Sequence, residues 1–234
     1  MVNTTKAPGL ASSWKPSFGQ EIYDGKIQEA KRAIEADKSV ATKLDESGRN
    51  AVHWACSGGH AEFVEYLDGL GIPIDTPDAN GWSPLMISVS AGKDELVKYL
   101  IQRGADVNQT NSSGQQPLHY AASKNRLATA ELLIELGASV NSKDNSGSTP
   151  LHRAVSQGHT RICDLLIKNG ARVNNPDNYG NTPLHVACEV GNSEIARLLA
   201  ENGASVEMKN KDERTPLDFC DKQLTQLLTR LAEG

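Results

Sequence analysis

A spacing of 33 residues recurs along this sequence of 234 residues. Glycine recurs at this spacing in two series, and in a third series Asn125 replaces one glycine. The three series are Gly48, Gly81, Gly114, Gly147 and Gly180; Gly71, Gly104, Gly137, Gly170 and Gly203; and Gly59, Gly92, Asn125, Gly158 and Gly191. Aliphatic residues keep the same spacing at Ile74, Val107, Val140, Val173 and Val206. Such a period indicates stacked structural repeats, each of which buries its apolar side against its neighbours.

Each repeat has the pattern of two helices separated by a tight turn. Thr149 and Pro150 are typical of the start of the first helix, because threonine caps a helix and proline suits its first position. Leucine pairs such as Leu165-Leu166 mark the second helix, and the glycine after it suits a left-handed cap. Aromatic residues make up only 5% of the chain. This low content fits thin layers of alanine, leucine and valine better than one large core.

The Thr-Pro-Leu-His sequence at 149–152 and 182–185, with this period, resembles the ankyrin-repeat family over roughly residues 15–234. The resemblance implies an all-α solenoid of seven helix-turn-helix repeats with β-hairpin-like finger loops. We expect a flexible tail at 1–14 and repeats at 15–47 (an N-terminal capping repeat), 48–80, 81–113, 114–146, 147–179, 180–212 and 213–234 (a C-terminal capping repeat). Glu213 stands where the first glycine series would continue.

Composition excludes several classes of function. The 24 basic and 29 acidic residues give a net charge of −5, so nucleic acid and anionic membranes are not expected partners. No apolar run approaches the length of a membrane span. The first 19 residues lack the apolar core of a secretory signal. Four cysteines without a Cys-x-x-Cys pair favour a reducing compartment, which is compatible with the cytoplasmic and nuclear location that we expect for this chain.

No residue pattern indicates catalysis, a cofactor or a metal site. His53, His119, His152 and His185 share one repeat position, which favours a structural imidazole near the start of each first helix. Equivalent residues in stacked repeats lie about 10 Å apart, too far for His60 and His159 to share a zinc ion. Cys56 and Cys188 are expected to be small buried residues. Glycine-rich phosphate loops are absent. We therefore expect a binding protein that is not an enzyme and has no cofactor.

A candidate partner-binding surface follows from the repeat geometry. In this family the concave face is made by the finger tips and by the residue after each histidine position, where Trp54, Ile87, Tyr120, Arg153, Val186 and Phe219 stand. Tryptophan, tyrosine and arginine are the residue types most enriched in binding hot spots. The candidate residues are Arg49, Trp54, Trp82, Tyr120, Lys124, Arg126, Arg153, Asp177, Tyr179, Glu189, Glu213 and Phe219. A basic middle and an acidic C-terminal end would suit a partner with the opposite order of charge.

Two alternatives for these residues stay open. Trp54 and Trp82 would serve packing if they stacked on each other to close a gap between fingers. The charged side chains would have no partner if they formed only a solvated surface.

Several stretches that depart from the repeat consensus resemble the gankyrin family of ankyrin-repeat proteins. They are His53-Trp54-Ala55-Cys56-Ser57, Gly81-Trp82-Ser83-Pro84-Leu85 and Pro117-Leu118-His119-Tyr120-Ala121-Ala122-Ser123-Lys124-Asn125-Arg126. The resemblance implies a monomeric chaperone that clasps the C-terminal helical domain of one proteasomal ATPase subunit and assists assembly of the regulatory-particle base. The positions that match the family's partner contacts are Arg49, Trp54, Trp82 and Lys124.

Two further points bear on the partner. The alternative client is another protein such as a cyclin-dependent kinase, although inhibitors of that class typically have fewer repeats. The family's retinoblastoma-binding Leu-x-Cys-x-Glu motif corresponds here to 186–190, where Val186 and Val190 replace both outer residues. We therefore do not expect that activity.

Overall fold

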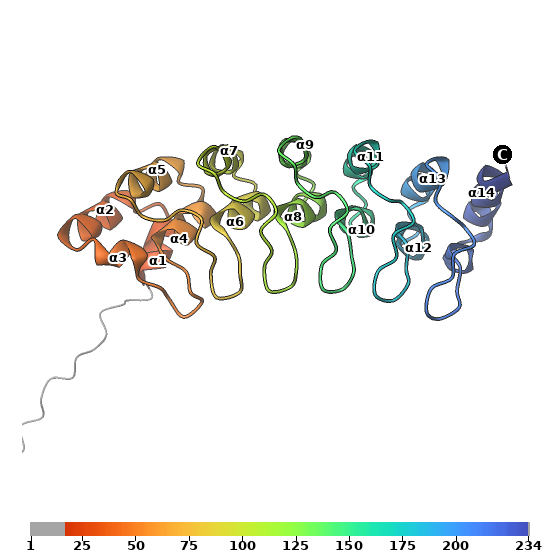
Figure 1. Cartoon of the computed structure of the whole chain (residues 1–234), viewed down its shortest axis with the longest axis horizontal. Helices are drawn as coiled ribbons and strands as arrows, with labels where there is room; N and C mark the ends of the chain where they lie inside the picture. The colour runs from red at the N-terminus through yellow and green to blue at the C-terminus, as the bar shows by residue number, and fades with distance from the viewer. Residues whose placement is uncertain (1–16, 234) are drawn as a thin grey trace, which may run out of the picture.

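The computed structural model describes residues 17–233 as a row of helix pairs. The expected tail at 1–14 lies outside the described residues. Figure 1 shows the pairs side by side in chain order, with one helix of each pair in an outer row, the other in an inner row, and the loops projecting beyond the inner row. No strand is assigned within residues 17–233, so the fold is an all-α repeat solenoid, as the sequence predicts.

The helices alternate between the two rows. The inner helices are α1 (Ser17–Tyr23), α4 (Ala51–Gly58), α6 (Pro84–Ala91), α8 (Pro117–Ser123), α10 (Pro150–Ser156) and α12 (Pro183–Glu189). The outer helices are α2 (Ile27–Ala36), α5 (Ala61–Gly69), α7 (Asp94–Gln102), α9 (Leu127–Glu135), α11 (Thr160–Lys168), α13 (Ser193–Glu201) and α14 (Lys222–Glu233). The first repeat also contains the short helix α3 (Ser39–Thr42), and a 3-10 helix, η1 (Pro216–Phe219), takes the inner position in the last repeat.

The last repeat therefore departs from the others. Its inner segment is a single 3-10 turn because the backbone of Cys220 is extended, and Asp221 then caps α14 by accepting a hydrogen bond from the N–H of Leu224 at 2.8 Å. The buried leucines of α14, Leu224 and Leu228, close the apolar end of the solenoid. A polar outer surface on this helix is what an end cap requires.

The core is a stack of thin aliphatic layers. Each inner helix from α4 to α12 buries a leucine or valine beside small residues, for example Leu151 and Ala154 in α10. Phe63 is the one aromatic residue in the buried core of the described chain. The scarcity of aromatics in the sequence is thus a property of the layers, and most of the remaining aromatic side chains lie at their edges.

Within residues 17–233, two non-glycine residues adopt the left-handed conformation. Asn125 replaces a turn glycine between α8 and α9 and has φ = 56°, as its place in the glycine series predicts. Glu213 replaces a finger glycine and has φ = 60°. Asparagine tolerates this region better than glutamate does, so Glu213 carries more backbone strain.

Candidate partner-binding face

The fingers are shaped by one aspartate or asparagine in each turn. Its side-chain oxygen accepts hydrogen bonds from the backbone N–H groups two and four residues later, at 2.8–3.1 Å. The six residues are Asp45, Asp78, Asn111, Asp144, Asp177 and Asn210, again 33 apart. Either residue type can close such a turn. This series was not predicted from the sequence, because aspartate and asparagine share the position and no single residue type recurs along it.

Neighbouring fingers are joined to each other through their backbones. The N–H of Ala79 donates to the carbonyl of Ser47 at 3.0 Å, and the next three fingers repeat this bond at 2.9 Å. Lys211 N–H donates to the carbonyl of Tyr179 in the last finger pair. The fingers consequently form a continuous hydrogen-bonded row, which fixes the spacing of the side chains that they carry.

Buried histidines tie the inner helices α8, α10 and α12 to the following finger, which confirms the structural role predicted for them. The Nδ1 atoms of His119, His152 and His185 accept a backbone N–H at the start of their own helix, at 3.1–3.2 Å. Nε2 therefore carries the proton, and it donates to the carbonyls of Ser148, Asn181 and Arg214 in the next finger, at 3.0–3.2 Å. His53 Nε2 has no such partner.

The second side-chain atom of the finger residue bonds a neighbouring side chain in five of the six fingers. We call this contact the finger lock. In three fingers the lock reaches the inner helix nine residues later: Asp45 with Trp54, Asn111 with Tyr120, and Asp144 with Arg153. In two fingers it reaches the preceding finger: Asp78 with Arg49, and Asn210 with Asn181. Predicted partner-binding residues are thus held in place by the fingers themselves.

Arg49 and Trp54 form one group at the N-terminal end. Arg49 Nε lies 2.9 Å from Asp78 Oδ2, and the Asp78 side chain is fully buried. The guanidinium also lies 5.8 Å from the centre of the Trp54 ring, within cation–π range. Trp54 donates its indole N–H to Asp45 and packs against the backbone of Gly19 in α1. Both side chains are half-buried, and the positive charge of Arg49 is largely balanced by Asp78.

Trp82 packs on Tyr120, with ring centres 4.4 Å apart. The alternative stacking of Trp54 on Trp82 is therefore wrong, because each tryptophan already has its partner within its own part of the row. Tyr120 also donates its hydroxyl to Gln115 and accepts from Asn111. Burial raises the pKa of Tyr120, so the hydroxyl remains protonated at neutral pH. Ile87, expected beside these residues, is instead buried and presents no surface for contact.

The basic residues in the middle of the row differ in their exposure and in whether they form ion pairs within the chain. Lys124 is exposed at the end of α8 and forms no ion pair within residues 17–233. Arg126 lies across Gly92, on the turn of the preceding repeat, and is half-buried. Arg153 pairs with Asp144. Burial alone would raise the pKa of Asp144, but hydrogen bonds from Arg153 and Ser146 outweigh it and hold the pKa below its usual value.

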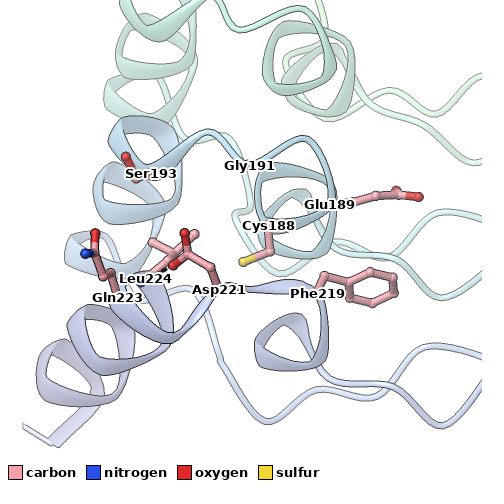
Figure 2. A pocket seen from close by; sticks show the side chains of 8 residues that line it. All are labelled: Cys188, Glu189, Gly191, Ser193, Phe219, Asp221, Gln223 and Leu224. Atoms are coloured by element: carbon pink, nitrogen blue, oxygen red, sulfur yellow. Dashed lines mark hydrogen bonds between the residues drawn. The ribbon is translucent and has the colours of Figure 1, made fainter.

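The acidic C-terminal end combines exposed carboxylates with two aromatic residues. Tyr179 is 69% exposed on its finger, and Glu189 and Glu213 are exposed as well. Figure 2 shows Glu189 and Phe219 pointing to the same side of a hollow of about 320 Å³ between the end of α12 and the start of α14. Phe219 is half-buried, with the Arg214 guanidinium 5.4 Å from its ring centre. Asp177 is half-buried, and its Oδ1 atom closes the finger turn.

The remaining reactive side chains are engaged in packing. Burial raises the pKa of the thiols of Cys56 and Cys163 to about 12, which keeps them protonated. Within residues 17–233 no cluster of three metal-ligating side chains occurs. Over the same part of the chain, no helix has the length and apolarity needed to cross a bilayer.

Repeated helix pairs, finger turns and histidine bridges together define a repeat scaffold with an extended side-chain face. The family model of ankyrin repeats matches residues 22–111, 70–144 and 118–212, so this chain belongs to the ankyrin-repeat family, whose fold is a protein-interaction scaffold. Its described part is similar to the ankyrin repeat domain of human ASB11, with a TM-score of 0.81 at 23% identity, covering 93% of this chain and 98% of that domain. At this identity the likeness concerns the fold.

A more specific similarity covers part of the chain. A stretch of 62 residues is 55% identical to the 26S proteasome non-ATPase regulatory subunit 10 of Homo sapiens, and the Rattus norvegicus protein gives the same value. The match covers 26% of this chain and 27% of each of those relatives, about a quarter of their length.

Proposed function

We propose that this chain binds the C-terminal domain of a proteasomal ATPase subunit and assists assembly of the base of the regulatory particle, without catalysing a reaction. The observation that carries the proposal is the stretch 55% identical to a proteasome regulatory subunit. That identity is well above the 23% shared with a domain of the same fold. We further propose that the protein acts in the cytoplasm and nucleus.

The face made by the fingers and inner helices is suited to such a partner. Trp54, Trp82 and Tyr120 lie half-buried in successive repeats and are held by hydrogen bonds or stacking before any partner arrives. Side chains ordered in advance lose less conformational entropy on binding. The concave placement follows from the family geometry, and the partner would lie along three or more repeats.

Internal pairing decides which charge can attract the partner. Arg49 and Arg153 are neutralised by Asp78 and Asp144, whereas Lys124 is exposed and has no ion pair in the described chain. Lys124 is therefore the cation whose reversal tests the binding site without disturbing the fold. Reversal of Arg49 would instead place two carboxylates beside each other, one of them in a fully buried side chain.

The experiment measures binding of the full chain to the purified C-terminal domain of each regulatory-particle ATPase, by biolayer interferometry. One domain should bind, and Lys124→Glu should weaken its affinity about tenfold, equivalent to about 1.4 kcal/mol. The matched control is Lys98→Glu, which reverses an exposed lysine of the outer helix α7 and should leave affinity unchanged. If no ATPase domain binds the wild-type chain, the proposed function is wrong.

A further inference from the structure

The finger lock is open in one finger only, at Asp177. Among residues 17–233, no side chain lies within hydrogen-bond distance of its Oδ2 atom, while the other five fingers each have a bonded partner. The reason lies in the residues at the two positions from which a lock is made. The residue nine positions after Asp177 is Val186, whose side chain has no hydrogen-bond donor. The residue at the lock position of the preceding finger is Ser148, whose hydroxyl accepts a hydrogen bond from the hydroxyl of Ser146 at 3.1 Å.

The nearby cationic side chains do not pair with the Oδ2 atom of Asp177. Lys143 donates to the carbonyl of Pro176, next to Asp177, and forms no ion pair with the carboxylate. Arg214 of the following finger lies over Phe219 instead. The Oδ1 atom of Asp177 accepts from the N–H groups of Tyr179 and Asn181 at 2.8 and 2.9 Å, so the carboxylate is already oriented.

We propose that Asp177 receives an arginine side chain from the binding partner, which completes the sixth finger lock in the complex. The identity of that partner rests on the proposed function. The chain itself indicates the chemistry, because both cations that occupy an aspartate lock, Arg49 on Asp78 and Arg153 on Asp144, are arginines. A guanidinium offers several N–H donors in a plane and can reach a partly engaged carboxylate more specifically than an ammonium group can.

The surroundings of Asp177 suit an arginine side chain. Val186 is half-buried at the position that Arg153 occupies one repeat earlier, so it offers an aliphatic surface to the methylene groups. Tyr179, in the same finger turn, is 69% exposed and offers an aromatic surface. The half-burial of Asp177 would strengthen the ion pair relative to one at the open surface.

The first test is Asp177→Asn, measured by affinity for the ATPase domain that binds the wild-type chain. The substitution keeps the finger turn, because Asn111 and Asn210 close the same turn in this chain. Its unfolding midpoint should match the wild type, and its affinity should fall about tenfold. The control, Glu194→Gln, makes the same change in net charge on the exposed side of α13 and should bind normally. An Asp177→Asn affinity within twofold of wild type would overturn the lock and leave the proposed function standing.

The second test needs no partner. Val186→Arg places an arginine nine residues after Asp177, as Arg153 stands relative to Asp144, and should close the lock within the chain. The melting temperature should rise about 2 °C, and the rise should vanish in Val186→Arg combined with Asp177→Asn. If no ATPase domain binds the wild-type chain, the comparison of the wild type, Val186→Arg and the double variant tests the site. A rise in melting temperature that depends on Asp177 supports an open guanidinium site at this carboxylate. Equal melting temperatures of the wild type and Val186→Arg refute it.

Discussion

Acidification should destabilise this solenoid through His53. Its side chain is fully buried, with Nδ1 2.8 Å from the side-chain oxygen of Asn50 and Nε2 without a hydrogen-bond partner. Burial lowers the pKa of His53 to about 4, and Arg49 acts in the same direction while Asp78 opposes it. The imidazole is therefore neutral in the folded chain at every pH at which the protein would normally be handled.

The magnitude follows from the difference between the folded and unfolded pKa values. Below pH 6.5 the unfolded chain binds a proton at this histidine and the folded chain does not, so the free energy of unfolding falls as the pH falls from 6.5 toward 4. The full gap corresponds to about 3 kcal/mol, and about 2 kcal/mol of it should be lost between pH 7 and pH 5. Burial also lowers the pKa of His119, His152 and His185, which adds to the loss in the same direction.

The assay combines urea unfolding at pH 7 and pH 5 with an NMR titration of the imidazole carbon-bound protons. The free energy of unfolding should be lower at pH 5, and the His53 resonance should not titrate until well below pH 5.5. A His53 resonance that titrates near 6.5 in the folded protein would refute the reasoning, whatever the urea data show.

Two further predictions concern the finger turns. Glu213→Gly should raise the free energy of unfolding, measured in urea titrations, by about 0.5–1 kcal/mol. Relief of the left-handed strain at φ = 60° should outweigh the loss of the exposed ion pair with Lys209 and the added entropy of the unfolded chain. A lower free energy of unfolding in this variant would show that the ion pair matters more than the backbone strain. Gly180→Ala should cost about 2 kcal/mol by the same measurement, since φ is +80° and the added Cβ would lie 3.0 Å from the backbone of Asn210 in the next finger; an unchanged midpoint would mean that the fingers can separate freely.

The repeat architecture could be predicted from sequence because its signals repeat. Glycine and aliphatic residues at a fixed spacing specify turns and buried faces many times over, so one exception such as Asn125 does not hide the pattern. The 3-10 helix at 216–219 was not predicted, because it occurs once and depends on the extended backbone at Cys220.

The details of the candidate face could be predicted only in part. Residue type identified Arg49 and Arg153, but not their pairing with buried aspartates. The lock partner lies nine residues away in some fingers and 29 in others, so spacing alone does not identify it. The buried position of Ile87 has a similar cause, because a place in the repeat does not tell which neighbours cover a side chain. Whether the twelve candidate residues bind a partner stays a prediction.

The row of backbone bonds between fingers restricts how this chain can change in length. Each bond joins positions 32 residues apart, as Ser47 and Ala79 are joined, and the turns on both sides are closed by the same kind of side chain. Each middle finger donates one backbone N–H to the finger before it and accepts one from the finger after it. One residue inserted into a finger would therefore misalign its bonds with both neighbouring fingers. Gain or loss of a whole repeat would disturb neither. The reach of the scaffold can therefore change only in discrete steps of one repeat, about 10 Å each, and a partner of a given length selects a whole number of them.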